Sequence, residues 1–103
     1  MLKPSVLEEI ATKRLRQIAK GYDAAHDDQH TKGEIALGAA AYCVSSVKYE
    51  GNGKRAYSTI QQWAPPEWPW GRDEFHPSGD PRSDLIDAAA MIVAEIERQD
   101  RIP

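Results

Sequence analysis

Apolar side chains recur every three to four residues in three stretches of the chain, the period of a helix with one buried face. The first stretch opens at Ser5 and Glu8, which fit a capping box, and closes at Gly21. It predicts a helix over about 5–20. The side chains expected to face the core are Leu7, Ile10, Ala11, Leu15 and Ile18.

The second stretch is rich in small residues. Thr31 and Glu34 repeat the capping-box pattern and predict a helix over about 31–49, which Gly51-Asn52-Gly53 is expected to end. Small side chains let neighbouring backbones approach closely, so this helix is expected to be the buried central one. They are Ala36, Gly38, Ala39, Ala40 and Ala41.

The third helix is predicted over about 81–99, because Asp80 is a strong N-cap residue and Pro81 suits the first helical position. Its pattern places one set of side chains inward: Leu85, Ala89, Ile92, Val93 and Ile96. Its charged set is expected to face outward: Glu95, Glu97 and Arg98.

Residues 54–80 form a long connection rich in tryptophan and proline. The prolines forbid a long helix there, although 58–63 could form one or two turns. A connection of this length in a small domain is usually functional or wraps the core. We therefore predict an all-α fold over 1–103, one small domain with three helices around a single core and the 54–80 loop packed over it.

Charge and composition exclude several classes of protein. The net charge is −3, with 13 basic and 16 acidic residues, so the chain lacks the basic field that favours nucleic acids. The longest apolar run, 35–47, is too short to span a membrane, and no signal-peptide pattern appears. The single cysteine, Cys43, cannot form an internal disulfide and is typical of a small buried side chain. These features indicate a cytoplasmic protein.

Polar residues gather just before the second helix and supply the ligand types of a divalent metal site: His26, Asp27, Asp28 and His30, with Glu34 one turn into the helix. The alternative is a solvated loop whose acids complement the positive helix end, with Thr31 as the cap. A Cys43 nucleophile served by one of the histidines, His76 included, is not expected.

A second acid set suggests an enzyme. Glu34, Asp84 and Asp87 lie on two predicted helices and resemble the magnesium ligands of the all-α nucleoside triphosphate pyrophosphohydrolases. Those enzymes pair acids one turn apart on each helix, and only Asp84 and Asp87 have that spacing. Asp84 is equally expected in the first turn of a helix for dipole reasons.

The tryptophans Trp63, Trp68 and Trp70 have two interpretations: a stacking wall for a flat ligand, or bulky cover for an alanine-rich core. Arg72 and Arg82 flank this segment and suit a phosphate or carboxylate. Both arginines equally suit surface pairs with neighbouring acids.

Five blocks of the chain resemble a family of small proteins encoded in tailed phages and bacterial prophages, whose pattern is close to ERQxQI, GW, EHDDxHxxGEL, WPW and RDLxxAAALIxAEIER. The resemblance covers most of the chain apart from 44–62, with Lys13 where an acid is usual and Tyr22 in place of tryptophan. It implies a phage or prophage accessory protein in a bacterial host and specifies no reaction. The matching blocks are 13–18, 21–22, 25–35, 68–70 and 82–98.

The chain is also similar to the repeat domain of ryanodine receptors, through Gly21-Tyr22, Asp28-x-His30 and Asp80-x-Arg82. This similarity implies that the fold can bind a nucleotide-like ligand.

We therefore expect a non-enzymatic accessory protein that binds a small phosphorylated, nucleotide-like molecule or a host protein, with no cofactor. The alternatives are a magnesium-dependent pyrophosphohydrolase that uses Glu34, Asp84 and Asp87, and a helical interaction module or homo-oligomer. The expected ligand-binding residues are His26, Asp28, His30, Thr31, Glu34, Trp68, Trp70 and Arg82.

Overall fold

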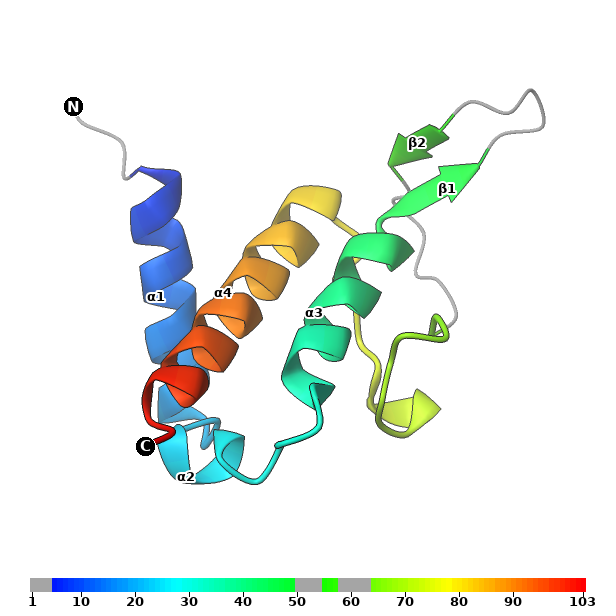
Figure 1. Ribbon diagram of the computed structural model, residues 1–103. Coiled ribbons are helices and arrows are strands. Elements are labelled where there is room, and N and C mark those ends of the chain that lie inside the picture. The colour runs from blue at the N-terminus through cyan, green and yellow to red at the C-terminus, as the bar shows by residue number, and fades with distance from the viewer. Residues whose placement is uncertain (1–4, 50–54, 58–63) are drawn as a thin grey trace.

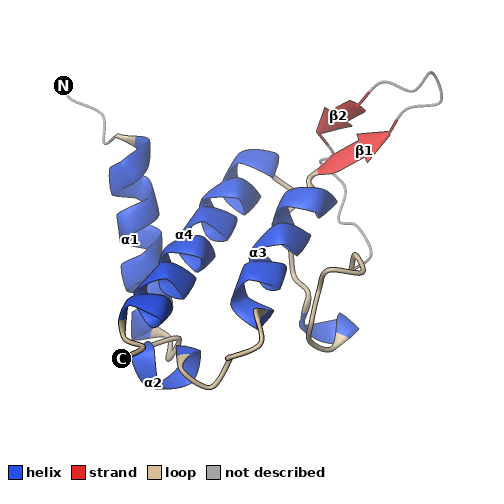
Figure 2. Ribbon diagram, viewed as in Figure 1, coloured by secondary structure: helices blue, strands red, loops and turns tan. Residues whose placement is uncertain are grey.

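The computed structural model describes residues 5–49, 55–57 and 64–103 and confirms the all-α prediction (Figures 1 and 2). All three predicted helices are present, with boundaries that differ from the expected ones by a few residues. The elements in order are α1 Val6–Ala19, α2 Ala24–Asp27, α3 Glu34–Ser45, β1 Val47–Tyr49, β2 Arg55–Tyr57, the 3-10 helix η1 Arg72–Glu74, and α4 Pro81–Asp100.

The second helix is shorter than predicted at its C-terminal end. It stops at Ser45, and residues 47–49 instead form β1, which pairs antiparallel with β2 (Figure 2). Val47 and Tyr49 favour extended backbone, which explains why a helix over 31–49 was wrong in its last turn. The expected stop at 51–53 and the expected turns at 58–63 lie outside the described residues.

Helix starts follow two of the three predicted caps. Ser5 accepts a hydrogen bond from the Glu8 amide at 3.1 Å, and the Asp80 carboxylate accepts one from the Ser83 amide at 3.3 Å. The Thr31 cap was wrong: Gly33 is the N-cap of α3, with a left-handed φ of 82° that suits glycine. Instead, a carboxylate oxygen of Glu34 accepts a hydrogen bond from the Lys32 amide. The helix begins at Glu34, three residues later than predicted.

Helix α4 is the central helix, with α1 against one side and α3 against the other (Figure 1). The expectation that the alanine-rich second helix is central was therefore wrong. Its small residues do allow close packing on α4, because the buried side chains on both helices are mostly alanine. They include Ala39 and Ala41 on α3 and Ala88, Ala90 and Ala94 on α4.

The predicted inward faces of α1 and α4 were wrong for most of their large side chains, although Ile10 and Val93 are half-buried. Leu7, Leu15 and Ile18 on α1 are exposed, as are Leu85, Ile92 and Ile96 on α4, whereas Glu95 and Arg98 are buried. The reason is geometric: α1 and α3 approach α4 from its two flanks, so each helix buries a flank and leaves its apolar row open.

A buried arginine joins the N-terminal half to α4. The Arg14 guanidinium donates to Asp27 Oδ2, to Glu97 Oε1 and to the Tyr22 carbonyl oxygen, each at 2.9 Å. Arg14 and Asp27 are both buried, and their ion pair fixes α2 against α1. No described helix is both long and apolar enough to cross a membrane.

The described part of the tryptophan-rich connection packs along α3. Phe75 is buried, with its ring 5.1 Å from Tyr42 and 5.0 Å from Trp68. The Trp68 indole N–H donates to the Gly71 carbonyl oxygen at 2.9 Å and closes a tight bend. This segment therefore holds both of its described tryptophans against the core, while Trp63 lies outside the described residues.

Candidate functional site

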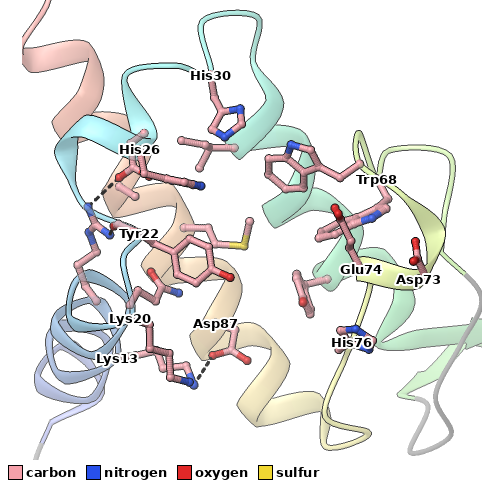
Figure 3. A pocket seen from close by; sticks show the side chains of 18 residues that line it. Lys13, Lys20, Tyr22, His26, His30, Trp68, Asp73, Glu74, His76 and Asp87 are labelled. Carbon is pink, nitrogen blue, oxygen red and sulfur yellow. Dashed lines mark hydrogen bonds and ion pairs between the residues drawn. The ribbon is translucent and has the colours of Figure 1, made fainter.

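A cleft of about 720 Å³ opens between α1 and the 68–76 segment (Figure 3). Lys13 and Lys20 line it from α1, and the 68–76 segment forms the opposite wall. Its floor is α4, which contributes a row of residues at helical spacing, Asp87, Met91 and Ala94. The cleft therefore combines residues from both halves of the chain, and its volume lies in the range of small-ligand sites.

A chain of ring contacts runs around one edge of the cleft. Tyr22 lies 5.0 Å from His26 between ring centroids, His26 lies 5.0 Å from His30, and His30 lies 5.4 Å from Trp70. Trp70 in turn lies 4.9 Å from Trp68. All four contacts are edge-to-face, the arrangement that aromatic quadrupoles favour. These contacts fix the rings relative to one another and form a continuous aromatic edge to the cleft.

Each of the two histidines on this edge, His26 and His30, has a carboxylate group next to its Nδ1 atom. His26 Nδ1 lies 2.9 Å from Asp27 Oδ1, and His30 Nδ1 lies 3.3 Å from Glu34 Oε2. An ionised carboxylate only accepts hydrogen bonds, so Nδ1 of each ring carries the proton and donates it. Nε2 is then left for other partners, as an acceptor in the neutral ring and as a donor in the protonated ring.

The two carboxylates are themselves held in place. Asp27 is buried against Arg14, as described above, so its orientation toward His26 is fixed. Desolvation by itself would raise the pKa of Glu34, but hydrogen bonds from the Lys32 amide, its own amide and His30 lower the pKa below its ordinary value. Glu34 therefore stays ionised beside His30 at neutral pH.

Charge is unevenly distributed across the cleft. The Lys13 ammonium lies 2.9 Å from Asp87 Oδ1 at the floor, and Lys20 lies about two helical turns further along the same wall. Asp73 and Glu74 line the opposite wall and are exposed, together with His76 (Figure 3). One side of the cleft therefore favours anions, and the other favours hydrogen-bond donors.

Gly38 allows the aromatic segment to reach the cleft. A Cβ atom at this position would lie 2.7 Å from Trp70 Cζ3 and 2.7 Å from Met91 Cε, closer than real contacts allow. Glycine thus provides the space in α3 that Trp70 and Met91 fill. The small-residue pattern of the second helix has a direct structural role here.

The structure brings together four of the eight expected ligand-binding residues. His26, His30, Trp68 and Trp70 all line the cleft, and Glu34 supports His30 from behind. The other three lie elsewhere. Asp28 pairs with Arg101 at 2.8 Å, Thr31 is exposed outside the lining, and Arg82 pairs with Glu9 near the other end of α1.

The three acids proposed as magnesium ligands are not brought together. Asp84 is buried and accepts hydrogen bonds from the Ser78 amide and hydroxyl at 2.7 and 2.8 Å. Asp87 faces Lys13, and Glu34 faces His30. Among the described residues, no group of three or more His, Cys, Asp or Glu side chains is placed to hold a metal ion.

Sequence reasoning missed most of the charged lining. Lys13 and Lys20 are seven residues apart on one helix face, a spacing that could have identified a basic strip. Tyr22 was noted only through the family resemblance, although it lines the cleft and stacks edge-on against His26. Cys43 is half-buried and outside the lining, and its burial raises the pKa of the thiol, as expected for an unreactive cysteine.

No protein-family model, curated protein or solved structure matches this chain. The resemblances to the phage family and to the ryanodine-receptor repeat therefore stay predictions.

Proposed function

We propose that the cleft binds a small nucleotide-like molecule with one phosphate group, and that the protein acts as a non-enzymatic phage or prophage accessory protein. The observation that carries this proposal is the composition of one cavity: two lysines and two carboxylate-backed histidines share it with Tyr22 and Trp70. Flat rings and nearby cations are the two features that nucleotide recognition requires.

The basic wall suits the phosphate. Lys20 is exposed and lines the cleft, and because His26 Nδ1 faces Asp27, Nε2 is the ring nitrogen left for a ligand. Lys13 already faces Asp87, so its charge is partly used within the protein. The anion in this proposal therefore contacts Lys20 and His26, in place of the Arg82 contact expected from the sequence.

The wall formed by the 68–76 segment carries Asp73 and Glu74, and it limits the ligand to a small negative charge. Asp73 and Glu74 would repel a second or third phosphate, while their oxygens accept hydrogen bonds from sugar hydroxyls or from the amino group of a base. A nucleoside monophosphate fits this distribution better than a triphosphate. The pyrophosphohydrolase alternative has no comparable support, because its three acids have separate partners.

The proposal predicts specific binding of monophosphates. In isothermal titration calorimetry with chelator present, AMP or another nucleoside monophosphate should bind more tightly than its nucleoside or inorganic phosphate alone. Lys20→Ala should weaken this binding about tenfold, equivalent to about 1.4 kcal/mol for one charge-assisted hydrogen bond. Tyr22→Ala should weaken it by a similar factor through lost stacking.

Arg16→Ala is the matched control, because Arg16 is an exposed cation on α1 outside the cleft lining. It removes the same charge as Lys20→Ala and should leave the affinity unchanged. Equal losses in the two variants would mean that only net charge matters and would contradict a site in the cleft. Absence of binding by all four nucleoside monophosphates would overturn the proposal in favour of a host protein as ligand.

A further inference from the structure

Large apolar side chains are exposed on all three main helices. On α1, Leu7 is 77% exposed and Leu15 is 66% exposed; on α4, Ile92 is 46% and Ile96 is 54% exposed. We call those that lie opposite the cleft the apolar face. Its members are Leu15, Leu37, Val44, Leu85, Ile92 and Ile96.

The apolar face lies on the side of the helix layer opposite the cleft. Successive helical residues are about 100° apart, so a side chain two residues away points about 160° from its neighbour. Leu37 and Val44 are each two residues beyond a cleft residue of α3, Ile35 and Tyr42.

The same geometry holds for one residue of α1 and for α4. On α1, Leu15 is two residues beyond the cleft residue Lys13, whereas Leu7 and Ile18 lie within about 40° of the cleft residue Arg14 and are not part of the apolar face. On α4, Ile92 is five residues beyond Asp87, which places it about 140° around the helix. The apolar face therefore occupies one side of the molecule, and the cleft occupies the other.

The apolar face extends over all three main helices, whereas a standard interface takes about 800 Å² from each partner. Soluble monomers rarely leave apolar patches of more than a few hundred Å² open to water. The members of the apolar face on α1 and α4 are also residues whose spacing predicts burial.

The row on α4 is complementary to itself. Leu85, Ala89, Ile92 and Ile96 are separated by four, three and four residues, a spacing that reads the same in both directions. In an antiparallel pair of α4 helices, Leu85 faces the partner's Ile96 and Ala89 faces the partner's Ile92. A two-fold axis then passes between Ala89 and Ile92, as an isologous interface requires.

Charges at the two ends of α4 agree with this arrangement. Arg82 lies beside the first turn of the row, where it also pairs with Glu9 of its own chain, and Asp100 lies beside the last turn; both are exposed. In the antiparallel pair, each Arg82 lies next to the partner's Asp100. A parallel pair would instead place like charges together at both ends.

We propose that two copies of this chain associate through the apolar face, with their α4 helices antiparallel about a two-fold axis. Both clefts then lie on the outer sides of the dimer and stay open. This inference is independent of what the cleft binds.

Light scattering coupled to size-exclusion chromatography tests the dimer. The chain has a mass of 11.5 kDa, and the wild-type protein should show twice that mass. Ile92→Glu places two carboxylates at the axis and should raise the dissociation constant at least about 100-fold, equivalent to about 2.7 kcal/mol. Circular dichroism should show the helices retained, because Ile92 is exposed in the single chain.

Thr12→Glu is the matched control, since it adds the same charge at an exposed helical position outside the apolar face. It should remain dimeric. Asp100→Arg should weaken association, and Arg82→Glu combined with Asp100→Arg should recover it. A wild-type mass of one chain throughout the micromolar range, or a dimer that Ile92→Glu leaves intact, would overturn the proposal; a failed charge-swap recovery would overturn the antiparallel arrangement.

Discussion

Gly38 shows how a single residue connects helix packing to the cleft. Gly38→Ala would place a methyl group 2.7 Å from atoms of both Trp70 and Met91. The flexible Met91 side chain can move away, but the Trp70 ring is also held against His30 and Trp68. Overpacking of this kind costs about 1–3 kcal/mol, and the better helix propensity of alanine offsets about 1 kcal/mol of it.

We therefore expect Gly38→Ala to lower the free energy of unfolding by about 1 kcal/mol and to change tryptophan fluorescence. Urea denaturation measures the first, and the emission spectrum of the native protein measures the second. In a Trp70→Leu background the same substitution should be neutral or stabilising, because the ring that opposes the methyl group is gone. An equal cost in both backgrounds would exclude the Trp70 contact as the cause.

Helix α4 buries an ion pair between Glu95 and Arg98 within its last turns. Glu95 accepts hydrogen bonds from Arg98 Nε at 2.6 Å and Nη2 at 2.9 Å, and from Gln99 at 3.1 Å. The Arg98 hydrogen bonds lower the pKa of Glu95 and outweigh the burial that would raise it. A folded-state pKa below the unfolded one stabilises the protein above the unfolded value, and this contribution disappears as the pH falls through the folded value.

The expected result is a loss of stability below about pH 5, which Glu95→Gln should reduce. At neutral pH this variant should be less stable by about 1.5–3 kcal/mol, because Arg98 loses a charged acceptor. Urea denaturation of both proteins between neutral and acidic pH measures the difference in their free energies of unfolding. That difference should shrink as the pH falls; a constant difference would contradict the assigned role of Glu95.

Helix positions were predictable because their signals are local. Ser5 and the Asp80-Pro81 pair mark helix starts whatever else the chain does, and both caps are present. The faces were not predictable in the same way, since burial depends on which flank a neighbouring helix approaches. Glu95 and Arg98 were expected outside for that reason, and Leu85 and Ile96 inside.

The candidate site was predictable in part on the same grounds. His26, His30, Trp68 and Trp70 were identified by residue type, and the packing of the 68–76 segment along α3 brings them to one cleft. Arg82 and the three acids depend on how α4 is rotated against its neighbours, which no local pattern specifies. Lys13 and Lys20 enter the site because α1 presents its flank, and not its apolar row, to α4.

The two sides of the helix layer differ in chemical character. The cleft side is polar and aromatic, and the opposite side carries the apolar face. A dimer that buries this face must be more stable at higher protein concentration, because association favours the folded form by mass action. A monomer with the same exposed residues would unfold at one temperature whatever its concentration.

We accordingly expect the midpoint of thermal unfolding to rise over a hundredfold increase in protein concentration. Differential scanning fluorimetry at low and high concentration measures the shift. Ile92→Glu should remove the concentration dependence and unfold near the low-concentration midpoint of the wild type, whereas Thr12→Glu should keep it. Because the clefts lie away from the two-fold axis, the unfolding midpoint of Lys20→Ala should also depend on protein concentration. Loss of the dependence in Lys20→Ala would mean that cleft and dimer contact are coupled, contrary to their placement on opposite sides of the layer.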